Sequence, residues 1–161
     1  MTGPLHYNGP GRPEVAEPGA WSFPPAERRT LSTGLDVLVY RLPGQYVVSA
    51  GLVLDTPLNL EARDREGVAE LTAGTLDQGT ASHPGTAFAE AVEDCGAALE
   101  ASVGYSSTRL YLDVPASRLG RALPLLAEAV REPTLTDADV ERERAIRLAD
   151  LEQQLAHGAS R

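Results

Sequence analysis

The stretch GVAELTAGTLDQGT, residues 67–80, places three unlike groups on one face of a short predicted helix. Glu70, Ala73 and Gly74 have the spacing i, i+3 and i+4, which brings their side-chain positions together. The carboxylate of Glu70 can ligate a cation or accept a proton. Ala73 and Gly74 offer neither a ligand atom nor a proton acceptor, so the residues of this face support no reaction by themselves.

Other reactive side chains are few and scattered. His6, His83 and His157 lie outside any motif that contains a nucleophile, and we expect each to be a solvated surface residue. Cys95, the single cysteine, lies in the apolar segment AVEDCGAAL, where we expect it to pack rather than react. One cysteine also excludes an internal disulfide and a cysteine-based zinc cage.

Composition narrows the classes of partner. The 161 residues suit one domain, and the net charge of −9 argues against nucleic acid and against an anionic membrane surface. No apolar run approaches the ~18 residues of a spanning helix. The N-terminal residues lack a basic start followed by an apolar stretch, so they do not indicate a signal peptide. We therefore expect a cytoplasmic protein that binds neither nucleic acid nor a membrane.

The first part of the chain divides into an arm and the start of a domain. Residues 1–27 are rich in proline and glycine and predict an arm, with an organised domain over 28–161. The β-branched runs 34–42 and 46–54 are joined by the turn dipeptide Pro43-Gly44, so we predict that they form a hairpin.

The remaining elements alternate helices and strands. Short helices are predicted over 66–77 and from Thr86, strands over 97–103 and 106–114, and two longer helices follow. The last helix is expected to start at Thr136 with Asp139 in a capping box, and its apolar stripe is Val140, Leu148, Leu151 and Leu155. This order predicts an α+β fold with two layers, a mostly antiparallel sheet and helices packed on one face.

At this point the chain resembles a known family, the pitrilysin/insulinase zinc metallopeptidases, from about Thr30 to Arg161. The resemblance is carried by the order and spacing of several segments: STGLDVLV, GVAEL followed by GT, DCGAALEAS, DVP, LPLLAEAVREP and VERER. It implies the layered half-domain fold of that family. It also implies that this chain covers only part of a larger subunit, so apolar surface on the last helices would lack its cover and favour association.

The resemblance assigns the opening helix to the metal motif. Active members carry H-x-x-E-H there, with two histidines on zinc and a glutamate that polarises the bound water. In this chain Glu70 and Gly74 match the histidines and Ala73 matches the general base. Asp150 matches a distal glutamate ligand, and Glu143 matches an acidic residue that the family often keeps.

Zinc catalysis needs three protein ligands, and only Glu70 and Asp150 could offer oxygen, so no metal and no cofactor are predicted. One alternative is a relic carboxylate site of Glu70, Asp77 and Asp150 around a hard cation. The other is that Glu70 is solvated or pairs with an arginine such as Arg109.

The resemblance also implies a way of holding peptide. Family members add an extended substrate to an edge strand beside the metal, and Glu100, Ala101 and Ser102 match that strand. Because main-chain pairing needs no particular side chain, this binding can outlast the zinc site. The alternative is an ordinary edge strand that Glu100 protects from aggregation.

The resemblance leads to three hypotheses about function. In the first, the chain is a non-catalytic subunit that pairs with an active insulinase-type subunit, or with itself, and helps to form a peptide-binding chamber. In the second, it is a structural subunit like the core proteins of the respiratory bc1 complex, without proteolysis. In the third, it is a self-sufficient peptidase, which the missing ligands argue against.

Overall fold

The computed structural model describes residues 19–20, 22–56 and 58–157. The chain divides into two compact units, residues 1–43 and 44–161, which are described one at a time. Most of the predicted arm lies outside the described residues. None of the described helices is long and apolar enough to cross a membrane.

The first unit contains a two-stranded antiparallel hairpin. Strand β1 (Glu27–Thr30) pairs with β2 (Asp36–Val39), and Gly34 in the connecting turn has a φ of +86°. The predicted hairpin between 34–42 and 46–54 is therefore wrong. Gly34 and Gly44, in the turns before and after β2, both have a φ of +86°, so either turn could have formed a hairpin. β2 pairs with the strand before it, and local turn signals do not decide between these two partners.

The second unit is built on a three-stranded antiparallel sheet in the order β3-β5-β4. Strand β3 spans Val47–Leu54, β4 spans Ala98–Val103 and β5 spans Thr108–Pro115. In this register Leu110 of β5 lies between Leu52 and Ala101 of its two neighbours. The strands predicted over 97–103 and 106–114 are confirmed, and β4 is an outer strand of this sheet.

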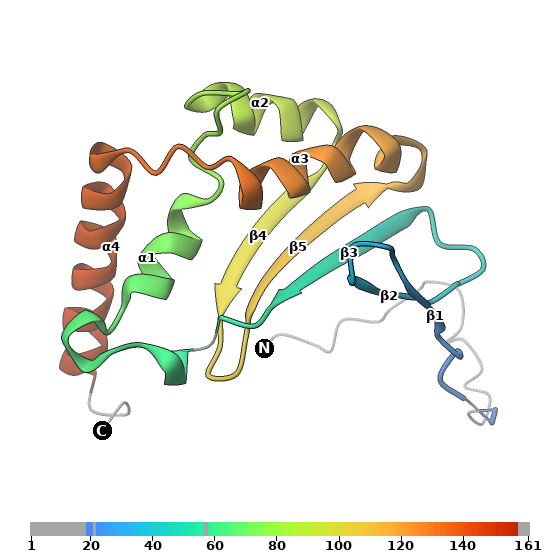
Figure 1. Ribbon diagram of the computed structural model, residues 1–161, viewed down its shortest axis with the longest axis horizontal. Helices are drawn as coiled ribbons and strands as arrows, with labels where there is room; N and C mark the ends of the chain where they lie inside the picture. The colour runs from blue at the N-terminus through green and yellow to red at the C-terminus, as the bar shows by residue number, and fades with distance from the viewer. Residues whose placement is uncertain (1–18, 21, 57, 158–161) are drawn as a thin grey trace, which may run out of the picture. The chain divides into compact units, whose positions relative to one another are not determined.

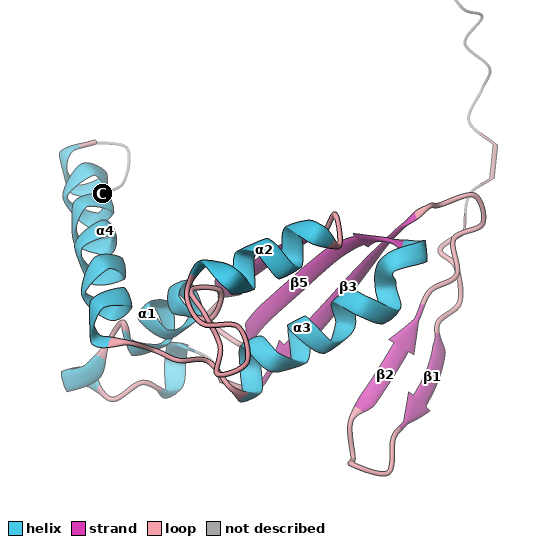
Figure 2. Ribbon diagram, turned by 90° about the horizontal axis from the view of Figure 1, so that it is seen from above, coloured by secondary structure: helices cyan, strands magenta, loops and turns pink. Residues whose placement is uncertain are grey.

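Two helices cover one face of the sheet, as Figure 2 shows. Helix α2 spans Thr86–Asp94 and α3 spans Leu119–Arg131. The side chains of β5 alternate between buried and exposed, which is the pattern of a sheet with one covered face. The core between the layers contains Phe88, Val92, Leu110, Leu112, Val114 and Leu126, all at most 7% exposed.

The remaining helices lie side by side at one end of the unit in both views (Figures 1 and 2). Helix α1 spans Val68–Thr75 and contacts both β4 and the long helix α4, Asp137–Ala156. Three short 3₁₀ helices connect the larger elements: Leu58–Leu60, Arg63–Arg65 and Ala116–Arg118. The predicted α+β fold, with an antiparallel sheet and helices on one face, is confirmed.

The start of α4 follows its sequence signal. The hydroxyl of Thr136 accepts a hydrogen bond from the backbone N–H of Asp139 at 3.2 Å, as a capping residue does. The predicted apolar stripe does not become a core. Leu148, Leu151 and Leu155 are 48%, 41% and 69% exposed, so this surface is uncovered within the described part of the chain.

Candidate functional site

The first turn of α1 is held by a carboxylate from the preceding loop. Glu61 accepts hydrogen bonds from the backbone N–H of Gly67 at 2.8 Å and of Ala69 at 2.6 Å. These two bonds lower the pKa of Glu61, because they favour its charged form. A carboxylate at this end also matches the positive end of the helix dipole. The loop therefore fixes the start of the helix that carries the candidate site.

The candidate site itself is the surface where α1 meets α4. Oε1 of Glu70 lies 3.9 Å from Nη2 of Arg147. One turn further along α1, a Cβ added to Gly74 would lie 2.4 Å from Oε1 of Glu143. After the helix ends, Gln78 accepts a hydrogen bond from Arg142 at 2.8 Å. Side chains of α4 thus contact α1 at two successive turns and also contact the residues that follow α1.

Three of the residues singled out in the sequence meet here: Glu70, Gly74 and Glu143. The partner of Glu70 is Arg147 rather than Arg109, which lies on β5 opposite Ser102. Ala73 is 5% exposed and belongs to the buried side of α1.

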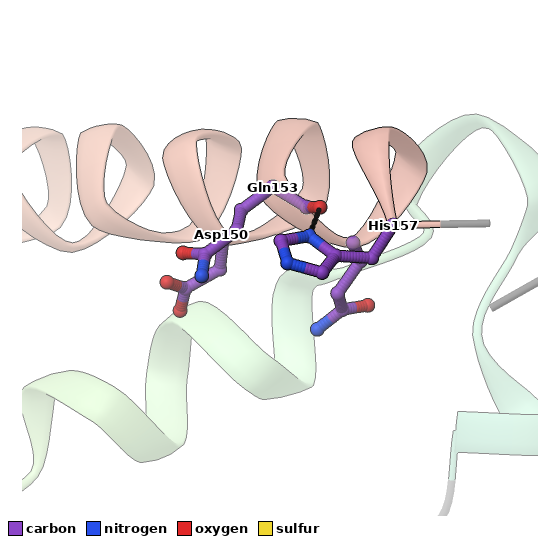
Figure 3. A pocket seen from close by; sticks show the side chains of 4 residues that line it. Asp150, Gln153 and His157 are labelled. Atoms are coloured by element: carbon purple, nitrogen blue, oxygen red, sulfur yellow. Dashed lines mark hydrogen bonds between the residues drawn. The ribbon is translucent and has the colours of Figure 1, made fainter. Parts of the chain in front are cut away.

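Asp150 lies further along α4. It lines a hollow of about 310 Å³ with Gln153, Gln154 and His157 (Figure 3). In that view its carboxylate is on the side of α4 that faces the green helix α1, while His157 bonds back to the carbonyl of Gln153 at 2.9 Å.

The donor set of this surface does not fit a zinc ion. Gly74 has no ligand atom, and the space that its side chain would occupy is filled by the carboxylate of Glu143. Glu70 already faces a cation, Arg147. Among the described residues, no three or more histidine, cysteine, aspartate or glutamate side chains are grouped so that they could hold a metal. The relic site of Glu70, Asp77 and Asp150 is therefore not formed.

The predicted peptide-binding segment lies in the middle of β4. Glu100 and Ser102 are exposed on the open face of the sheet, and Ala101 is half-buried toward the helices. On its inner side β4 pairs with β5, and no described strand pairs with its outer side. The backbone groups of that outer side are what a further strand would use. Since α1 contacts β4, the candidate site and the outer strand belong to the same end of the unit.

A second cluster of chemically active side chains was missed by sequence reasoning. Glu128 of α3 accepts hydrogen bonds through Oε1 from the hydroxyl of Thr80 and from Nδ1 of His83, the latter at 2.8 Å. Burial alone raises the pKa of Glu128, but these hydrogen bonds outweigh it, so the pKa of this carboxyl lies below its usual range. Thr80 is fully buried and His83 is half-buried, so the prediction of a solvated His83 is wrong.

This cluster fastens the loop between α1 and α2 to α3. Backbone hydrogen bonds reinforce it: Ala81 donates to the carbonyl of Glu132 at 2.9 Å and Thr134 donates to that of Gly79 at 3.0 Å. The loops that follow α1 and precede α4 are thereby joined. Thr80 donates to a carboxylate rather than to an imidazole, so the cluster lacks the contact that activates a hydroxyl nucleophile. Its structural effect is to set α1 against α4.

The geometry defines a class of fold: an α+β half-domain with helices on one face of an antiparallel sheet, in which the described side chains between α1 and α4 form no set of metal ligands. The family comparison agrees with this class, because residues 36–157 match the model of the insulinase family, peptidase family M16. The chain belongs to the insulinase (M16) family.

Known proteins similar to this chain include a subunit of a cytochrome complex and a subunit of a processing peptidase. Subunit 1 of the bovine mitochondrial cytochrome b-c1 complex is 28% identical over 132 residues, which are 82% of this chain and 27% of the relative. A probable mitochondrial-processing peptidase subunit beta from Arabidopsis thaliana is 25% identical, over 82% of this chain and 25% of the relative. The chain thus spans about a quarter of the length of these two relatives.

Solved structures share the fold. A protease from Helicobacter pylori superposes with a TM-score of 0.74 at 21% identity, covering 83% of this chain and 32% of that one. A peptidase M16 inactive domain from Pseudomonas fluorescens also gives 0.74, at 23% identity, with 82% of this chain and 32% of that one covered. At 21% and 23% identity, these comparisons show that the chain shares the fold of the two structures.

Proposed function

We propose that this chain is a non-catalytic M16 subunit that pairs with an active insulinase-type subunit and lends its β4 edge to the binding of an extended peptide. The observation that supports the proposal is the lack of a ligand atom at position 74, on the face of α1 that meets α4. Where the family motif needs a histidine, Gly74 offers only backbone, and the carboxylate of Glu143 fills the space of the missing side chain. This face cannot bring three ligands to a metal or activate a water molecule.

The peptide-binding half of the proposal is supported by β4. Its outer backbone groups point away from β5 and pair with no described strand, and the side chains at 100 and 102 are exposed on the open face of the sheet. Strand addition draws its affinity from main-chain hydrogen bonds, so it does not depend on the lost metal ligands. We infer a peptide-binding pseudoenzyme from this combination.

The pairing is tested by reconstitution. The chain is mixed with candidate M16 subunits that carry an intact H-x-x-E-H motif, and peptide hydrolysis and complex formation are measured together. We expect a complex whose peptidase activity exceeds that of the active subunit alone. Absence of both a complex and a change in activity across the M16 subunits of the same cell would refute the pairing.

The mode of peptide binding is tested on the ligand, which leaves the fold of the chain untouched. A bound peptide is resynthesised with a single N-methyl group moved along its backbone. Strand addition engages every second N–H of the peptide, so we expect affinity to fall at alternate positions. The matched control is methylation at the intervening positions. A uniform loss, or no loss at any position, would refute binding by strand addition.

One relative favours a second function. The match to bovine cytochrome b-c1 subunit 1 supports a structural subunit in an assembly without peptide turnover. Purification of the chain with its natural partners distinguishes the two functions. Recovery of an M16 peptidase supports the first, and recovery of an assembly that contains no peptidase supports the second.

A further inference from the structure

The face of α4 that is turned to α1 carries both signs of charge. Glu143, Arg147 and Asp150 follow one another at i, i+4 and i+7, so they share one side of the helix. Glu143 and Arg147 are half-buried, whereas the neighbours Arg144 and Leu148 are exposed. With Glu70 of α1, three carboxylates thus lie along a surface that also contains the guanidinium of Arg147.

The arginines of this part of α4 differ in their partners. The ion pairs of Arg142 with Asp139 at 2.7 Å and of Arg144 with Glu141 at 3.2 Å lie within α4 itself. Arg142 also donates a hydrogen bond to the uncharged side chain of Gln78. Arg147 instead reaches across to Glu70 on α1 at 3.9 Å. The carboxylate at position 70 is therefore matched by a cation from the opposing helix, at the position where the family motif would place a ligand of a metal ion.

We propose that Arg147 takes the place of the metal ion, supplying the positive charge between α1 and α4 and thereby excluding zinc. The inference rests on the proposed non-catalytic state of the site, and it adds a residue that enforces that state. A dication at this surface would lie close to the guanidinium charge, and like charges at such a distance repel. Glu143 is the weaker obstacle, because it carries no charge that repels a cation, and its whole side chain can leave the space beside position 74 by changing rotamer.

The proposal is tested by restoring the ligands. The triple variant Glu70→His/Gly74→His/Asp150→Glu is prepared with Arg147 intact and with Arg147→Met, and zinc affinity is measured by competition with a chelating dye. We expect Arg147→Met to raise the affinity for zinc by at least about tenfold, because the repulsion is removed. The matched control is Arg144→Met in the same triple variant, which removes one positive charge from the exposed side of α4.

Equal zinc affinity with and without Arg147, or an equal gain from Arg144→Met, would overturn the proposal. Because the probe is zinc alone, the result does not depend on any partner or peptide. Failure of the reconstitution with active subunits would therefore leave this measurement intact, and a negative zinc result would leave the pairing intact.

A second measurement uses the natural sequence, in case the triple variant does not fold. Hydrogen exchange is followed at the backbone amides of α1 in Arg147→Met and in Arg144→Met. We expect exchange in α1 to become about two- to fivefold faster in Arg147→Met, the range expected for a partly exposed ion pair, and to stay unchanged in Arg144→Met. Unchanged exchange in both variants would overturn the claim that Arg147 joins α1 to α4.

Discussion

The close approach between Gly74 and Glu143 makes a quantitative prediction about one methyl group. In an open helix, Gly→Ala stabilises by about 1 kcal/mol, because alanine loses less conformational entropy on folding. Here the new Cβ would lie 2.4 Å from Cδ and Oε1 of Glu143 and 2.8 Å from its Cγ. Contact with Cγ means that turning the carboxylate alone is not enough, so the whole side chain must leave its position.

Displacing a packed side chain costs about 1–3 kcal/mol, so Gly74→Ala should be neutral or should destabilise by up to about 2 kcal/mol. In Glu143→Ala the obstructing atoms are gone. There Gly74→Ala should stabilise by about 1 kcal/mol. The double-mutant cycle then has a coupling of at least about 1 kcal/mol. Urea denaturation of the four proteins, followed by circular dichroism, measures each term.

A second glycine provides the control. Gly120 lies near the start of α3, and an added Cβ there meets nothing within 4 Å. Gly120→Ala should stabilise by about 0.5–1 kcal/mol whether residue 143 is glutamate or alanine. If Gly74→Ala behaves like Gly120→Ala in both backgrounds, Glu143 does not fill the space above Gly74, and the account of the candidate site fails.

Three further predictions concern the contacts that hold α1 in place. Thr80→Val should lower the free energy of unfolding by about 1–2 kcal/mol, because it removes a buried hydrogen bond to a carboxylate, and thermal or urea denaturation measures the loss. The pKa of Glu128 is lowered in the folded protein, so its contribution to stability is complete above its unfolded pKa and is lost as the pH falls through its folded pKa. In Glu128→Gln the melting temperature should therefore fall less steeply with decreasing pH, which a pH series of thermal melts measures. Glu61→Gln should speed hydrogen exchange in the first turn of α1, since the charged acceptor of the N–H groups of Gly67 and Ala69 is lost, and unchanged exchange would contradict this role.

Local signals predicted the elements that are fixed by local chemistry. Thr136 and Asp139 located the start of α4 because the capping bond joins residues three apart. Gly104, between the two predicted strands, separates β4 from β5 as expected. The hairpin was wrong because Pro43-Gly44 and the turn before β2 are both good turns, and the sequence does not say which neighbour a strand chooses.

The sequence did not predict which side chains pair with each other between different helices and loops. The family resemblance placed Gly74 and Glu143 at one site, as the structure does. It did not indicate that Glu70 pairs with Arg147, because that pairing depends on how α4 is rotated about its axis relative to α1. The contact of His83 with Glu128 joins residues 45 positions apart in the chain. Neither residue has a neighbour in sequence that signals this contact, so only the fold reveals it.

An M16 peptidase site binds a metal ion and binds a peptide through different chemical groups. Peptide binding can therefore be proposed for a chain that lacks the metal ligands. Metal binding depends on side chains at a few positions of α1 and α4, and a single glycine at position 74 removes a ligand. Peptide binding by strand addition depends on the backbone of β4, which any sequence compatible with a strand retains. Loss of the ligands leaves a carboxylate at Glu70 that needs a counter-charge, and Arg147 provides it from within the chain. Under the proposed function, selection for peptide binding would preserve the sheet edge and the α1–α4 contact without any requirement for metal ligands.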